Sequence, residues 1–231
     1  YASWVPSMDE GWTRYVFEKE AAVPYVTLRD ADVRKGRLRE RFDAIVLPDE
    51  PSDVLLKGHA PGSMPEEYTG GLGPMGVSAL LAFVEAGGTL VTLDSASLFA
   101  IDQLQLPVKN GLSTLDAGGF YCPGAILEAS SSGAPLAHGL GEKAPIWFES
   151  SPAFDVAGGQ AVLRYAADEP LLSGWLLGGP HLKGRAALVE VPVGQGKVVL
   201  FGFRPQYRAQ SWLTYIPFLN ALYLSAARPR P

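Results

Sequence analysis

Three apolar runs of the chain are too continuous to form strands with one face in water. They are residues 44–47 (AIVL), 89–93 (TLVTL) and 197–203 (KVVLFGF). Such runs are typical of strands buried on both faces of a parallel sheet. Before the second run, apolar residues recur at helical spacing: Val77, Leu80, Leu81 and Val84. Alternating strands and helices predict an α/β protein, which we expect to be a flavodoxin-like doubly wound parallel sheet.

The pattern changes from about residue 111 onward. Short apolar runs are separated there by glycine and proline, and their length favours added antiparallel strands. The runs are residues 125–129, 161–165, 171–177 and 186–191. We therefore interpret residues 1–231 as a single domain with a β-rich insertion at about residues 111–195. Residues 1–4 resemble the end of a strand, so we expect the sequence to be a fragment of a longer chain.

Local signals place the other elements. Ser7 and Glu10 have capping-box spacing, which predicts a helix over residues 8–20. A short strand is expected at residues 25–28. Residues 50–73 form a long segment without periodicity, and such loops are often functional. A final helix is expected over residues 210–226, kinked or divided at Pro217.

The composition excludes several classes of function. With 19 Lys and Arg against 24 Asp and Glu, the formal charge is −5, so nucleic acid is not an expected partner. No stretch approaches the roughly 20 apolar residues of a membrane span, and no membrane insertion is expected. The single cysteine, Cys122, excludes an internal disulfide and any zinc cluster built from cysteines.

Polar residues follow the predicted strands at their carboxyl ends, where open parallel sheets bind ligands. Four segments are expected to converge there: residues 6–11, 48–53, 94–97 and 204–208. The candidate ligand-binding residues are Asp9, Glu10, Asp49, Asp94, Ser95, Arg204, Gln206 and Arg208.

Residues 93–97 lie between a buried strand and a helix, which is the setting of a nucleophile elbow. An amidotransferase would carry cysteine at the elbow. One register places Asp94 there and the other places Ser95, and both remain open. Asp94 is also in a position to cap the helix that follows.

The last apolar run continues into Phe203-Arg204-Pro205-Gln206, where a class I glutamine amidotransferase would carry Phe-His-Pro-Glu. A guanidinium cannot accept a proton at neutral pH, so Arg204 cannot replace the histidine base. No catalytic residue is predicted, and Asp94, Ser95, Arg204 and Gln206 are degenerate positions. We expect Asp94 and Arg204 to form an ion pair that lowers the pKa of the aspartate.

Two alternatives remain. The first is a hydrolase that uses Ser95 or Asp94 with a histidine from a distant loop, for which only His59, His138 and His181 are available. The second is a glycan- or peptide-binding module that uses Arg204, Arg208, Trp175 and Trp212. Because the histidines lie in unrelated loops, neither a metal site nor a cofactor is predicted.

Five segments, in one order, resemble the C-terminal domain of bacterial zinc carboxypeptidase-like proteins: residues 7–14 (SMDEGWTR), 42–49 (FDAIVLPD), 87–90 (GGTL), 171–176 (LLSGWL) and 202–206 (GFRPQ). The resemblance runs from about Ser7 to Tyr223. It implies a class I glutamine amidotransferase-like fold that follows a carboxypeptidase A-like peptidase domain, with the zinc ligands upstream of Tyr1. The implied role is a non-catalytic accessory domain, structural or ligand-binding, whose partner is that peptidase domain and whose ligand is a small molecule, peptide or glycan. The resemblance also implies an exported parent protein.

Overall fold

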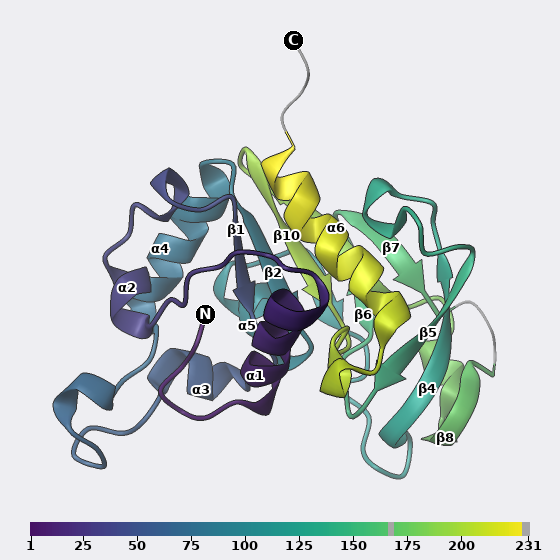
Figure 1. Cartoon of the computed structure of the whole chain (residues 1–231). Helices are drawn as coiled ribbons and strands as arrows, with labels where there is room; N and C mark the ends of the chain where they lie inside the picture. The colour runs from purple at the N-terminus through teal and green to yellow at the C-terminus, as the bar shows by residue number, and fades with distance from the viewer. Residues whose placement is uncertain (166–168, 228–231) are drawn as a thin grey trace.

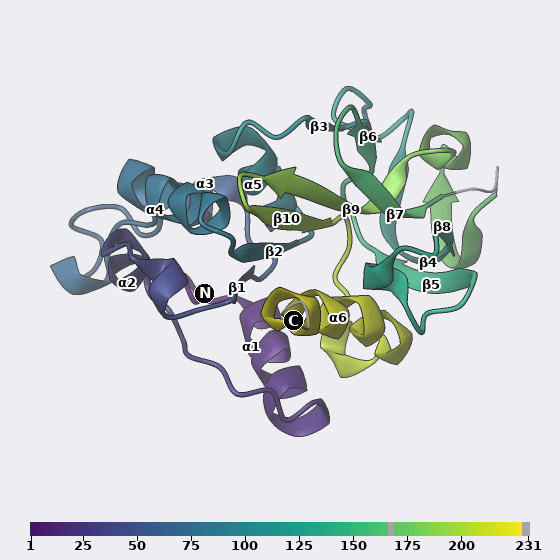
Figure 2. The same ribbon diagram turned by 90° about the horizontal axis from the view of Figure 1, so that it is seen from above.

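The computed structural model describes residues 1–165 and 169–227, and these form one mixed sheet of ten strands with helices on both faces of its parallel part (Figures 1 and 2). The helices are α1 (Met8–Tyr15), α2 (Asp30–Arg34), α3 (Ser52–Lys57), α4 (Gly73–Glu85), α5 (Ser95–Gln103) and α6 (Tyr215–Ala226). The strands are β1 (Ala44–Leu47), β2 (Thr89–Leu93), β3 (Val108–Asn110), β4 (Tyr121–Ser131), β5 (Lys143–Phe148), β6 (Phe154–Val156), β7 (Gln160–Arg164), β8 (Leu171–Leu177), β9 (Ala186–Val193) and β10 (Gly196–Phe201).

The sheet order is β1-β2-β10-β9-β7-β4-β5, with β6 joining β3 to β9 and β8 pairing with β4. Only β1, β2 and β10 are parallel, and every other pairing in the described residues is antiparallel. The expected flavodoxin-like doubly wound parallel sheet is therefore wrong. The reason is the tight hairpin at Gly194 (φ 57°), which lays β9 antiparallel beside β10, so that the sheet continues as a curled antiparallel half (Figure 2).

The three apolar runs do form adjacent strands, and β2 at their centre is buried at every position. Successive residues of β2 point to opposite faces of the sheet. Leu90 packs in the core under α3, α4 and α5, whereas Val91 packs in the core that includes Phe218 of α6 (Figure 2). The strands are thus covered on both sides, which explains why their sequences do not alternate.

The N-terminal helix begins as predicted, because Ser7 Oγ accepts a hydrogen bond from the Glu10 amide at 3.2 Å. The helix continues as a π-helical turn over Val16–Glu20, so the expected extent is confirmed. The strand expected at residues 25–28 is wrong: this segment is extended but pairs with no strand among the described residues. As a result, β1 is the edge of the sheet.

The remaining segments differ in smaller ways. The long segment over residues 50–73 contains α3 and a 3-10 turn at Glu66–Tyr68. A first turn is separate from the C-terminal helix, because a 3-10 turn at Trp212–Thr214 precedes α6, but α6 itself contains Pro217, so the division lies before the proline and not at it. The predicted insertion and the predicted single domain extend over residues 166–168 and 228–231, which lie outside the described residues. Across the described ranges, we find no helix with the length and apolar character to cross a membrane.

Candidate functional site

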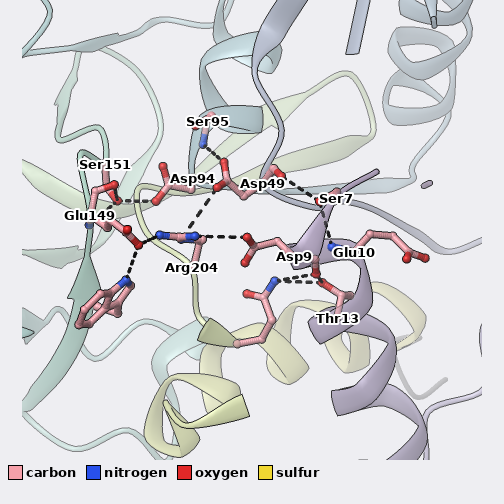
Figure 3. A network of polar contacts seen from close by, with 12 residues as sticks. Ser7, Asp9, Glu10, Thr13, Asp49, Asp94, Ser95, Glu149, Ser151 and Arg204 are labelled. Atoms are coloured by element: carbon pink, nitrogen blue, oxygen red, sulfur yellow. Dashed lines mark hydrogen bonds and ion pairs between the residues drawn. The ribbon is translucent and has the colours of Figure 1, made fainter. Parts of the chain in front are cut away.

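The carboxyl ends of the three parallel strands meet the first turn of α1 (Figure 3). Asp49 follows β1, Asp94 follows β2 and Arg204 follows β10, while Asp9 comes from α1. The sequence placed these residues in four separate segments, and the structure brings all four side chains into one polar network.

Asp94 forms the sharp turn between β2 and α5. Its backbone has φ 49° and ψ −116°, a region that non-glycine residues rarely adopt. The Asp94 amide donates to the carbonyl of Phe201 at 2.9 Å, which ties the turn to β10. This strained strand-to-helix turn is the geometry of a nucleophile elbow. The backbone therefore places Asp94 at the raised position and Ser95 in the first turn of α5, where its amide donates to Asp49 Oδ1 at 3.0 Å.

Arg204 lies among three carboxylates, and only 10% of its side chain is exposed. One terminal nitrogen lies 3.3 Å from Asp9 Oδ2, the other contacts Glu149, and Nε is 3.9 Å from Asp49 Oδ2. These partners come from the α1, β5 and β1 regions of the chain. The guanidinium therefore connects the end of β10 to α1 and to the ends of β1 and β5.

The predicted ion pair between Asp94 and Arg204 is wrong, because Arg204 pairs with the other three carboxylates. The Asp94 carboxylate instead accepts a hydrogen bond from the hydroxyl of Ser151 (Figure 3). Burial, helped by the nearby charge of Asp49, raises the pKa of Asp94 to about 8, although the Ser151 hydrogen bond and Arg204 oppose this shift. The predicted direction of the pKa shift is also wrong, because burial favours the protonated form of Asp94.

The two residues at the ends of the network, Asp9 and Gln206, join β10 to α1. Gln206 donates to Thr13 Oγ1 at 3.0 Å and to the Asp9 carbonyl at 3.4 Å. Burial raises the pKa of Asp9, and Asp49 adds to this effect while Arg204 opposes it. Both side chains are almost fully buried, and Asp9 Oδ1 and Gln206 Oε1 have no hydrogen-bond partner in the described chain.

Two candidate residues lie outside the network. Glu10 forms an ion pair with Arg14 along α1. Arg208 is exposed and its guanidinium lies 5.3 Å from the ring centroid of Tyr207. The tryptophans of the alternative binding module, Trp175 in β8 and Trp212 before α6, are 67% and 71% exposed. Neither tryptophan takes part in the contacts of Arg204.

No histidine of the described residues reaches the elbow. His59 Nε2 lies 3.3 Å from the carbonyl of Trp4, and across residues 1–165 and 169–227 no histidine hydrogen-bonds to Asp94 or Ser95. Cys122 is buried in β4, and burial raises the pKa of its thiol to about 11. In the same ranges, no group of three or more His, Cys, Asp or Glu side chains is arranged to hold a metal ion.

The sequence reasoning missed the residues that follow β5. Glu149 and Ser151 complete the network, and Trp147 supports Glu149 with a hydrogen bond of 3.2 Å while stacking on Tyr207 at 4.3 Å. The signal was weak, since β5 contains Pro145. Apolar residues nevertheless stand at every second position, Ala144, Ile146 and Phe148, and this spacing could have indicated a strand that ends in polar residues.

Comparison with known proteins supports the fold. No protein-family model and no curated protein matches the chain. Among solved structures, the chain is similar to a cytoplasmic protein from Salmonella typhimurium at 15% identity and a TM-score of 0.55, covering 95% of this chain and 87% of that one. It is also similar to a protein from Bacteroides uniformis described as ThuA-like, at 11% identity and a TM-score of 0.50, covering 96% and 85%.

A β-galactosidase from Bacillus circulans aligns with 68% of the chain at 14% identity and a TM-score of 0.45, and the chain spans 21% of that enzyme's length. At these identities the likenesses show the fold alone. Together, these neighbours support an α/β fold, and one of them is described as ThuA-like. A carboxypeptidase-associated domain is not among the neighbours named above.

Proposed function

We propose that this chain is a non-catalytic domain with an amidotransferase-like elbow, in which charged residues hold the strand ends together instead of performing chemistry. The observation that carries the proposal is the position of Arg204, which follows β10 where a base would stand and is enclosed by Asp9, Asp49 and Glu149. The resemblance of the sequence to zinc carboxypeptidase-like proteins supports an accessory role beside a peptidase domain.

The chemistry of the elbow argues against catalysis. A guanidinium cannot act as a general base at neutral pH. Asp94 holds its proton because burial raises its pKa to about 8, and a neutral carboxyl group is a poor nucleophile. Ser95 contributes its backbone amide to Asp49, and no base contacts its hydroxyl in the described residues. These contacts therefore argue against nucleophilic catalysis at this site.

A structural role fits the same contacts. Arg204 and its partners connect β10, β1, β5 and α1, which are far apart in sequence. Removing one member of a buried ion pair costs about 3–5 kcal/mol because the other charges remain buried without compensation. The network is thus able to contribute a large part of the marginal stability of a domain.

The accessory role also needs a surface for the partner. Strand β8 and its neighbour β4 expose apolar side chains that a soluble domain usually buries: Tyr121, Ile126, Leu172, Trp175 and Leu177. Exposed apolar patches of this kind are typical of protein interfaces. A peptidase domain of the parent protein, supplied as a separate chain, should bind this chain more weakly when Trp175→Ser is introduced.

The proposal is tested by turnover of a panel of amides and esters, including release of ammonia from glutamine. We expect the rate of hydrolysis with the wild-type chain to equal the uncatalysed rate in buffer alone. Asp94→Asn and Ser95→Ala variants, checked for folding, distinguish trace activity of the elbow from contamination. Turnover above the buffer rate that disappears in either variant would show that the domain is a hydrolase and refute the proposal.

A further inference from the structure

Strand β8 forms an open edge of the antiparallel half of the sheet. Among the described residues it pairs with β4 alone, and Figure 1 shows it at the periphery of the molecule. Six of its seven residues are exposed, including Leu172 at 54% and Trp175 at 67%. In the described chain, the side of β8 that faces away from β4 therefore presents a row of backbone amides and carbonyls with no strand beside it.

The composition of β8 does not protect this edge. Natural edge strands commonly carry a lysine, another charge or a proline that prevents them from pairing with a further chain. Strand β5, which ends the sheet on the other side of β4, follows this rule with Lys143 and Pro145. The sequence of β8 is Leu-Leu-Ser-Gly-Trp-Leu-Leu, without a charge and without a proline. One edge beside β4 is thus protected and the other is suited to pairing.

The hydrogen bonds between β4 and β8 show which residues of β8 face the open edge. The Glu128 amide in β4 donates to the Pro170 carbonyl at 2.7 Å. Alternate residues of an antiparallel strand bond to the same side, so Ile126 also bonds toward β8. Because Ser173 lies opposite Ile126, the backbone groups of Ser173 bond back to β4.

Alternation assigns the other residues of β8. Trp175 bonds toward β4 as Ser173 does, and the register with β4 is regular between the two. Gly174 lies between them, so its amide and carbonyl point away from β4. The same holds for Leu172 and Leu176, two residues to either side. These three residues form a set of donors and acceptors that is centred on Gly174.

The sequence of β8 is complementary to itself about this centre. In an antiparallel pair of identical strands with a two-fold axis at Gly174, each Leu172 lies opposite Leu176 of the second copy. All three outward residues then pair at once, which gives about six backbone hydrogen bonds. Moving the axis by one residue would leave Leu172 or Leu176 without a partner. The register that pairs the most backbone groups therefore also places leucine opposite leucine.

We propose that two copies of this chain associate through β8, antiparallel and with the two-fold axis at Gly174. The antiparallel half of the sheet then continues from one copy into the other. The ring of Trp175 stands opposite Ser173 of the second copy, a small residue that leaves room for it. The contact uses the edge of β8 rather than the face of β4 and β8, so it does not depend on the accessory role proposed above.

The first test is sedimentation velocity of the chain between about 1 and 100 µM. We expect a reversible dimer in this range, because a single strand pair is a small interface. Ser173→Lys places two like charges about 7–8 Å apart across the two-fold axis and should raise the dissociation constant of the dimer about tenfold or more. Ser63→Lys adds the same charge in an exposed loop and serves as the control. A monomer at every concentration, or equal dissociation constants of the two variants, would overturn the proposal.

The second test is a cross-link that depends on the register. Ser173 and Trp175 of opposite copies form a pair without mutual hydrogen bonds, with Cα atoms about 4.5 Å apart, which suits a disulfide. A chain with Ser173→Cys mixed with a chain with Trp175→Cys should therefore form a disulfide-linked dimer on oxidation. Either chain alone should form little, since the natural Cys122 is buried. Equal cross-linking in the mixture and in the separate chains would overturn the proposed pairing.

Discussion

Replacement of Asp94 by asparagine should change how the stability of the domain depends on pH. Burial raises the pKa of this carboxyl group from an ordinary value of 3.8 to about 8. Between these values the folded state keeps the proton and the unfolded state releases it. Stability from this group is therefore fully present below pH 3.8 and is lost as the pH rises toward 8. The Asp94→Asn variant has no proton to lose, and its amide has nearly the shape of the protonated carboxyl group.

The size of the effect follows from linkage. A difference of one proton between the two states changes the free energy of unfolding by about 1.4 kcal/mol per pH unit. From pH 5 to pH 7, both within the window, the wild-type chain should lose about 3 kcal/mol that the variant does not lose. Other carboxyl groups titrate in both proteins, so the difference between the two reports Asp94 together with its coupling to Asp49 and Asp9.

The assay is urea denaturation followed by tryptophan fluorescence at pH 5, 6 and 7 and constant ionic strength. The chain has five tryptophans to report unfolding. Asp53→Asn, at an exposed position of α3, serves as the matched control for removal of a carboxylate. If the stability of the wild-type chain and of Asp94→Asn changes in parallel with pH, the raised pKa and the protonated elbow are both wrong.

Two further predictions concern the network and the backbone. Ser151→Ala removes the hydroxyl that donates to Asp94, so it should lower the free energy of unfolding by about 1–3 kcal/mol. Because that hydrogen bond lowers the pKa of Asp94, its loss should also extend the pH-dependent loss of stability above pH 8. The same denaturation series measures both effects. Gly196→Ala should lower the melting temperature, because a Cβ atom there would lie 2.2 Å from the Gly88 carbonyl oxygen. Gly11 in α1 has open space around it, so Gly11→Ala should raise the free energy of unfolding by about 0.5–1 kcal/mol. Equal effects of the two glycine substitutions would refute this packing argument.

The sequence predicted the parallel part of the sheet because burial on both faces leaves a local signal. Each residue of β2 is apolar or threonine, and no neighbour is needed to recognise such a strand. The short later runs favoured antiparallel strands, and β4, β7, β8 and β9 do pair antiparallel. The sequence did not show that only three strands are parallel and that β9 joins β10 directly through a hairpin at Gly194, so the expected doubly wound sheet was wrong.

The same contrast applies to the site. Four residues follow predicted strands at their carboxyl ends, and this position predicted that they would lie close together: Asp9, Asp49, Asp94 and Arg204. The structure brings them together. The sequence could not show which carboxylates would reach Arg204, because Glu149 follows β5, a strand that the sequence analysis did not identify. The sequence was equally compatible with Asp94 and with Ser95 at the elbow position. Only the backbone angles of Asp94 in the structure identify it as the residue at the turn.

The measurement that tests the central claim most directly compares the unfolding free energies of Arg204→Met and Arg208→Met. Arg204 has three carboxylate partners and is 10% exposed, whereas Arg208, four residues later, is exposed beside Tyr207. If these charges hold the strand ends together, Arg204→Met should lower the free energy of unfolding by about 3 kcal/mol or more. Arg208→Met should lower it by less than about 1 kcal/mol. Equal, small losses in the two variants would contradict the claim that the elbow site of this domain serves its structure.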